Sequence, residues 1–115
     1  MTRDQFITKI ESLLEFKHKN EFCMYSNNLM VMHSKLFFDF YVTDLGVTGS
    51  VLYSEILEIS LIEDSGGRLF MHISCLSGNL CMPASGFDIK AGASVHKIEQ
   101  DQTVVLDQAE ERKTP

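Results

Sequence analysis

The chain has 115 residues, of which 44% are hydrophobic, 16 are acidic and 10 are basic, and its formal net charge is −6. This length suits one domain that buries a hydrophobic core without a metal or a disulfide. The negative charge repels phosphate backbones and argues against nucleic-acid binding. The polar residues 1–5 argue against a secretory signal, and no stretch approaches the roughly 20 apolar residues of a membrane span. We expect one cytoplasmic domain over residues 1–115, whose three cysteines, Cys23, Cys75 and Cys81, are free thiols.

The first segment predicts an amphipathic helix. Thr2 and Gln5 match a capping box, which satisfies backbone N–H groups at a helix N-terminus. Positive charge at residues 17–19 suits the C-terminal end of a helix dipole. Apolar residues recur at the spacing of one helical face, at Phe6, Ile7, Ile10, Leu13 and Leu14.

Three strands follow in the prediction. Residues 22–25 and 29–32 are short apolar runs, and the Ser26-Asn27-Asn28 segment between them is typical of a hairpin turn. Residues 36–42 are aromatic and β-branched enough for a third strand. Alternation places Phe38, Phe40 and Val42 on one face and Phe37, Asp39 and Tyr41 on the other. Both faces are largely apolar, so we expect both to contact something.

The run from Ser50 to Glu63 is ambiguous. As a helix it would be capped by Ser50, and Leu52, Ile56 and Ile59 would form an apolar stripe. As a strand it would place Val51, Tyr53, Leu57, Ile59 and Leu61 on one face. Fourteen residues without Gly or Pro exceed the usual strand length, which favours the helix.

A second hairpin and a last helix complete the expected order. The turns at residues 64–67 and 77–79 bracket the strand 68–76, and the strand 80–82 returns before a proline. From Ser94 a helical spacing begins, although residues 103–106 alone could form a strand, and residues 109–115 are expected to fray. The helical positions are Val95, Ile98, Gln102, Val105 and Ala109.

The sequence offers no catalytic or metal-binding pattern. Zinc ligands come in closely spaced pairs, whereas Cys75 and Cys81 are six residues apart, and His72 and Cys75 would point to opposite faces of a strand. Cys23 and His33 could pair across the first hairpin, but nothing beside them activates a nucleophile. We therefore expect a non-catalytic binding protein without metal or cofactor.

Six methionines, eight phenylalanines and three tyrosines are more apolar side chains than one small core obviously needs. Met is flexible and polarisable, which suits surfaces that accept varied partners. The alternative is that these side chains are simply buried in the core.

The order of the expected elements resembles the class I type III secretion chaperones of Gram-negative bacteria. The match is carried by Leu52-Tyr53-Ser54-Glu55-Ile56-Leu57-Glu58, Ser65-Gly66-Gly67-Arg68-Leu69-Phe70-Met71 and Ser77-Gly78-Asn79-Leu80-Cys81. It implies an α+β fold, α-β-β-β-α-β-β-α, with a twisted antiparallel sheet flanked by helices. It also implies a homodimer that holds the N-terminal segment of a secreted effector in extended form, soluble and competent for export.

The resemblance further implies two surfaces. The dimer interface would include Leu52, Ile56, Ile59 and Leu69. The cargo-binding surface would include Ile7, Ile10, Leu14, Met30, Met32, Phe38 and Phe40.

Two other classes remain open. If residues 51–62 form a strand, the chain could be a PH-like or YcxB-like β-barrel with a C-terminal helix that binds a protein or a lipid. An immunity-type inhibitor, which caps the active site of a toxin, would also exploit the acidic charge.

Overall fold

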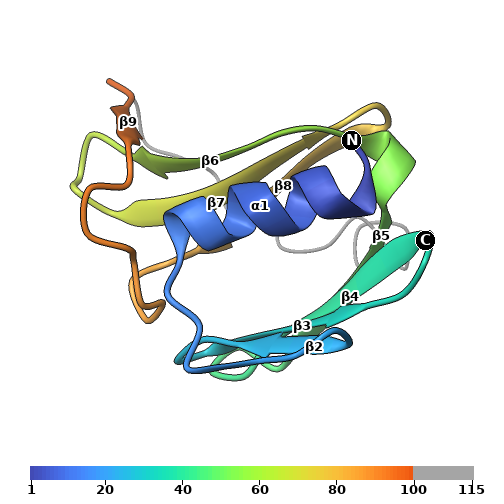
Figure 1. The fold of residues 1–115 in the computed structure, drawn as a ribbon. Helices are drawn as coiled ribbons and strands as arrows, with labels where there is room; N and C mark the ends of the chain where they lie inside the picture. Colours follow the sequence, from blue (N-terminus) through green and yellow to red (C-terminus); the bar gives the residue numbers. More distant parts are fainter. Residues whose placement is uncertain (100–115) are drawn as a thin grey trace.

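In the computed structural model, which describes residues 1–99, one α-helix lies between two β-sheets (Figure 1). The first sheet and the helix use residues 3–52, and the second sheet uses residues 56–97. The elements are α1 Arg3–Leu13, β1 His18–Lys19, β2 Cys23–Tyr25, β3 Leu29–His33, β4 Phe37–Val42, β5 Val47–Leu52, the 3-10 helix η1 Tyr53–Glu55, β6 Ile56–Glu63, β7 Leu69–Cys75, β8 Gly78–Pro83 and β9 Val95–Lys97.

Both sheets are built mainly from antiparallel neighbours. The five-stranded sheet has the order β1-β2-β3-β4-β5, and every pair in it is antiparallel. The four-stranded sheet has the order β8-β7-β6-β9, in which β9 runs parallel to β6. Figure 1 shows β5 rising from the first sheet toward the second, so the two sheets are joined at one corner by η1.

The helix α1 fills the space between the sheets, as its apolar spacing predicts. The capping box is confirmed: the Thr2 hydroxyl accepts from the Gln5 N–H, and the Gln5 amide accepts from the Thr2 N–H. Phe6 and Ile10 are buried in the shared core. The Phe6 ring stacks on Phe38 of the first sheet, with centroids 4.2 Å apart, while α1 also contacts β6 of the second.

The expected helix over residues 50–63 is wrong. The segment forms the end of β5, the short η1 turn and the strand β6. Its fourteen residues are therefore two strands with a corner, at which Tyr53 is buried and its N–H donates to the Leu36 carbonyl. Tertiary pairing decides the structure, because β5 pairs with β4 along its whole length and β6 pairs with β7.

The α-β-β-β-α-β-β-α order with helices flanking one sheet is consequently not the fold. Among residues 1–99 the structure has a single α-helix, enclosed by two sheets. The strands predicted at residues 22–25, 29–32 and 36–42 and the hairpin of β7 and β8 are confirmed.

The helix predicted to begin at Ser94 is also wrong over residues 94–99. Val95–Lys97 form β9 because the edge of β6 offers a row of backbone partners, and Leu61 pairs with Val95 there. Ile98 follows β9, and its N–H donates to the Glu63 carbonyl at 2.9 Å. Gln102, Val105 and Ala109, with the strand 103–106 and the tail 109–115, lie outside the described residues. Within residues 1–99, no helix is long and apolar enough to cross a membrane.

The turn between β6 and β7 is held by one carboxylate. The Asp64 side chain is fully buried and accepts hydrogen bonds of 3.0 Å from the N–H groups of Gly66 and Arg68. Its second oxygen accepts from the Arg68 guanidinium at 2.7 Å. Gly67 has φ +79°, a conformation that other residues rarely adopt.

Candidate functional site

The five-stranded sheet presents two different faces. The inner face, with Phe38, Phe40 and Val42, is buried against α1 and the second sheet. Alternation along the strands places the remaining side chains on the other side, which we call the outer face. The outer face comprises His18, Cys23, Tyr25, Met30, Met32, Phe37, Asp39, Tyr41, Thr48, Ser50 and Leu52.

The outer face is apolar and aromatic over β2, β3 and β4. Cross-strand pairs join Cys23 with Met32, Tyr25 with Met30, and Met30 with Tyr41. Its side chains are half-buried or exposed rather than buried. Within residues 1–99 no helix packs on this face, since α1 lies on the other side of the sheet.

Four of the eight exposed large apolar side chains of residues 1–99 lie at one end of this sheet. Met32 and Leu52 are 40% and 47% exposed on the outer face itself. Phe22, which precedes β2, is 66% exposed, and Leu36, in the turn before β4, is 72% exposed. The register places all four at the same end of the sheet, because β2 and β4 begin where β3 and β5 end. Apolar side chains clustered in this way mark interaction surfaces.

The strand β5 is an edge of the sheet. The Tyr53 N–H donates to the Leu36 carbonyl, and this fixes the alternation of hydrogen-bonded pairs between β4 and β5. The backbone groups of Thr48, Ser50 and Leu52 consequently point away from β4. On that side the described chain places no further strand.

The predicted cargo-binding residues divide between this face and the core. Met30 and Met32 lie on the outer face, and Ile7 is half-buried on α1. The other four are buried in the core, each at most 2% exposed, so they cannot contact a partner while the domain is folded: Ile10, Leu14, Phe38 and Phe40.

The predicted dimer residues are likewise divided. Leu52 lies exposed on the outer face, and Leu69 is half-buried at the start of β7. Ile56 and Ile59 are buried in the core. The helical stripe that would have joined Leu52 with Ile56 and Ile59 does not exist, because β5 and β6 belong to different sheets.

The pair of Cys23 and His33 considered in the sequence does not form. Cys23 lies on the outer face and His33 on the inner face. Cys81 instead stands opposite His72 in the register of β7 and β8, which the sequence analysis missed. Burial raises the pKa of Cys81 to about 11, so this thiol stays protonated. Among residues 1–99 no group of three or more His, Cys, Asp or Glu could hold a metal.

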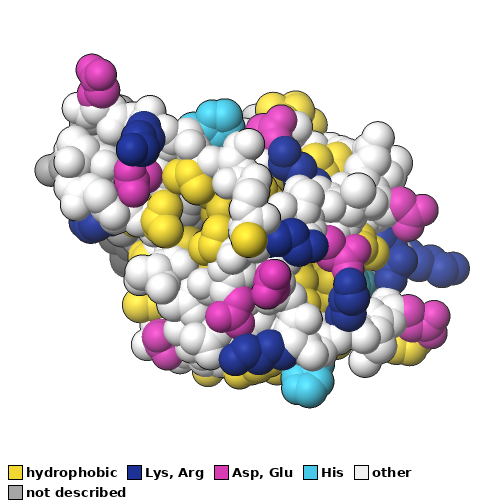
Figure 2. Space-filling view, turned by 60° about the vertical axis from the view of Figure 1, so that its left-hand side comes forward, with side chains coloured by type: hydrophobic (Ala, Val, Ile, Leu, Met, Phe, Trp, Pro, Cys, Tyr) yellow, Lys and Arg dark blue, Asp and Glu magenta, His cyan; other side chains and the backbone are white. Residues whose placement is uncertain are grey.

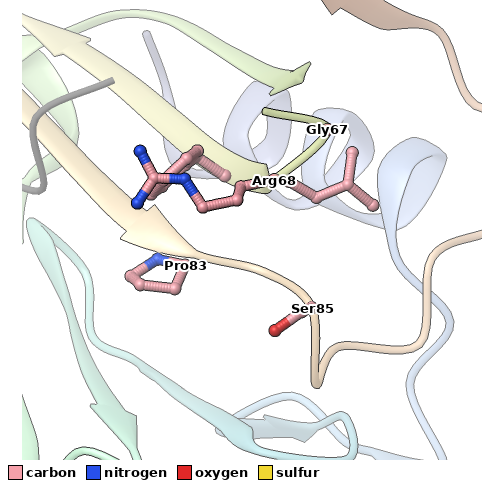
Figure 3. A pocket seen from close by; sticks show the side chains of 6 residues that line it. Gly67, Arg68, Pro83 and Ser85 are labelled. Carbon is pink, nitrogen blue, oxygen red and sulfur yellow. The ribbon is translucent and has the colours of Figure 1, made fainter. Parts of the chain in front are cut away.

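A pocket of about 420 Å³ lies at the start of β7, lined by Gly67, Arg68, Leu69, Phe70, Pro83 and Ser85 (Figure 3). The guanidinium of Arg68 lies 5.4 Å from the centroid of the Phe70 ring. Asp64 neutralises this guanidinium through its ion pair, which leaves a mainly apolar pocket. The pocket adjoins a second buried cluster formed by Ile62, Phe70 and Cys81.

The charged side chains do not form a patch of one sign on the side of the molecule in Figure 2, where acidic and basic groups are interspersed around apolar ones. No family model, curated protein or solved structure matches this chain. The outer face is therefore the feature from which a function can be argued.

Proposed function

We propose that this chain is a non-catalytic binding protein that receives an extended, apolar segment of another polypeptide on the outer face. The observation that carries the proposal is the exposure of Met32 and Leu52 on a half-buried, Met-rich and aromatic sheet face, with the exposed Phe22 and Leu36 at the same end of the sheet. Burying these side chains against a partner would contribute roughly 25 cal/mol for each Å² of apolar surface.

The edge of β5 gives the segment a way to bind. An extended polypeptide adds to a sheet by pairing with outward backbone groups, here those of Thr48, Ser50 and Leu52. Alternate side chains of the added strand would then extend the outer face. Residues 47–52 contain no charge and no proline, the usual devices that keep an edge strand unpaired.

The cargo we propose is the N-terminal segment of a type III secreted effector, held in the bacterial cytoplasm in an export-competent form. This choice of cargo comes from the short sequence segments that carry the resemblance, since the element order it implied is not the fold. The outer face supports the mode of binding. The net charge of −6 would keep a domain with such a face dispersed.

The proposal includes a homodimer, as the same resemblance implies. Of the four predicted interface residues, Leu52 is the one that is exposed. A dimer through Leu52 would compete with cargo for the β5 edge. Light scattering of the chain alone and of the Leu52→Asp variant tests whether the dimer forms through Leu52. We expect both to be dimers, because the proposed interface leaves the β5 edge available for cargo.

Co-expression with the products of neighbouring genes tests the function itself. We expect a stable complex with the N-terminal region of one secreted protein, and we expect Met32→Glu to abolish it. Leu57→Glu is the matched control, because Leu57 is 58% exposed on the other sheet. A complex that survives Met32→Glu, or one that Leu57→Glu disrupts equally, would contradict the proposal.

A further inference from the structure

We infer that Asp39 makes the outer face select a segment with a basic side chain between two apolar ones. This inference rests on the proposed function and adds the chemistry of the bound segment. Asp39 is the one carboxylate of the outer face, as defined above, and it stands near the middle of β4. Within the described chain its side chain forms no hydrogen bond and no ion pair.

The immediate neighbours of Asp39 offer it nothing to neutralise its charge. In the register of the sheet it stands opposite Met32 on β3 and Ser50 on β5. Along its own strand, the outer-face neighbours are Phe37 and Tyr41. A carboxylate that lies among apolar side chains gains more from a cationic partner than one surrounded by water, because the local dielectric constant is lower.

The position of Ser50 leaves an open path from the β5 edge to this carboxylate. Asp39 and Ser50 are a non-hydrogen-bonded pair, in which side chains lie closest together, and serine is short. A strand added beside β5 would lie about 10 Å from β4, which is two strand spacings. The long stem of Arg or Lys could cross over Ser50 to Asp39, whereas a shorter side chain could not.

The positions on either side of Ser50 favour apolar partners. Leu52 and its cross-strand neighbour Phe37 form an apolar surface on one side. On the other side Thr48 pairs with Tyr41. The preferred segment therefore carries apolar, basic and apolar residues at every second position, so that all three lie on the outer face.

Two labelled peptides test the inference directly: Thr-Leu-Val-Arg-Val-Leu-Thr and the same peptide with Gln in place of Arg. Both read the same in either direction, so parallel and antiparallel addition present the same side chains. Fluorescence anisotropy measures their binding to the wild-type chain, to Asp39→Asn and to Asp44→Asn. Asp44, exposed in the loop after β4, is the control that removes the same charge elsewhere.

We expect the wild-type chain and Asp44→Asn to bind the Arg peptide about tenfold more tightly than the Gln peptide, as for a hydrogen bond between charged groups. Asp39→Asn should bind both peptides equally and should melt at the wild-type temperature. Equal binding of both peptides by the wild-type chain, or an unchanged preference in Asp39→Asn, would overturn the role of Asp39 while the proposed function stands. Failure of the wild-type chain to bind either peptide would overturn both.

Discussion

Replacing Phe6 by alanine should remove the contact that anchors α1 on the first sheet. The Phe6 side chain is fully buried on α1. Its ring stacks on Phe38 at 4.2 Å, and its centroid lies 5.4 Å from that of Tyr53 and 6.1 Å from that of His33. Truncating a buried Phe to Ala costs about 3–5 kcal/mol. This is a large part of the total stability of a domain of this size, which is on the order of 10 kcal/mol.

Urea denaturation followed by far-UV circular dichroism measures this loss. We expect the unfolding midpoint of Phe6→Ala to fall by on the order of 2 M urea, with an unchanged slope. Ile7→Ala, on the same helix but half-buried, is the control and should lose less than half as much. A loss below about 1 kcal/mol for Phe6→Ala would refute the view that this ring anchors α1 on the first sheet.

Three further substitutions test other parts of the structure. Burial, and next the nearby Arg3, lower the pKa of His33 below 6.5 despite the opposing effect of Glu11. The unfolded chain therefore binds more protons than the folded one, and stability should fall as pH drops below about 6.5. His33→Gln should flatten this dependence in thermal melts. Asp64→Ala should cost on the order of 2–4 kcal/mol in urea denaturation, because two backbone N–H groups and a guanidinium lose their acceptor. Ile59→Ala should cost about 2–5 kcal/mol in the same assay, as for a fully buried side chain.

The local parts of the fold could be predicted because neighbouring residues determine them. The capping box and the spacing of Phe6 and Ile10 define α1, and Ser26–Asn28 define the first turn. The alternation along residues 37–42 correctly placed Phe38 and Asp39 on opposite faces. It did not identify the buried face, and Phe38 was wrongly expected on the cargo-binding surface.

The path of residues 50–63 could not be predicted, because it depends on distant strands. Val, Ile and Leu at those positions fit a helical stripe and an extended strand equally well. Pairing of β5 with β4 and of β6 with β7 decides between them, and the partners of residues 50–63 in those pairs lie 6 to 19 positions away. The mistaken helix then placed Leu52, Ile56 and Ile59 on one surface, although only Leu52 is exposed.

Of the candidate site, only the parts that depend on neighbouring residues could be predicted. A face rich in Met and aromatic side chains follows from the sequence, and Met30 and Met32 lie on it. The placement of Phe22 and Leu36 at the same end of the sheet as Leu52 does not follow from the sequence, because it arises from the register of four strands.

Photo-crosslinking tests the binding face most directly. A benzoylphenylalanine placed at position 32 on the outer face and, separately, at position 57 on the other sheet would be activated in cells that express the chain with its neighbouring genes. The account predicts a crosslink from position 32 to one extended segment of a secreted protein, identified by mass spectrometry, and none to that segment from position 57. A crosslink from position 57 alone, or from neither position while the complex forms, would contradict it.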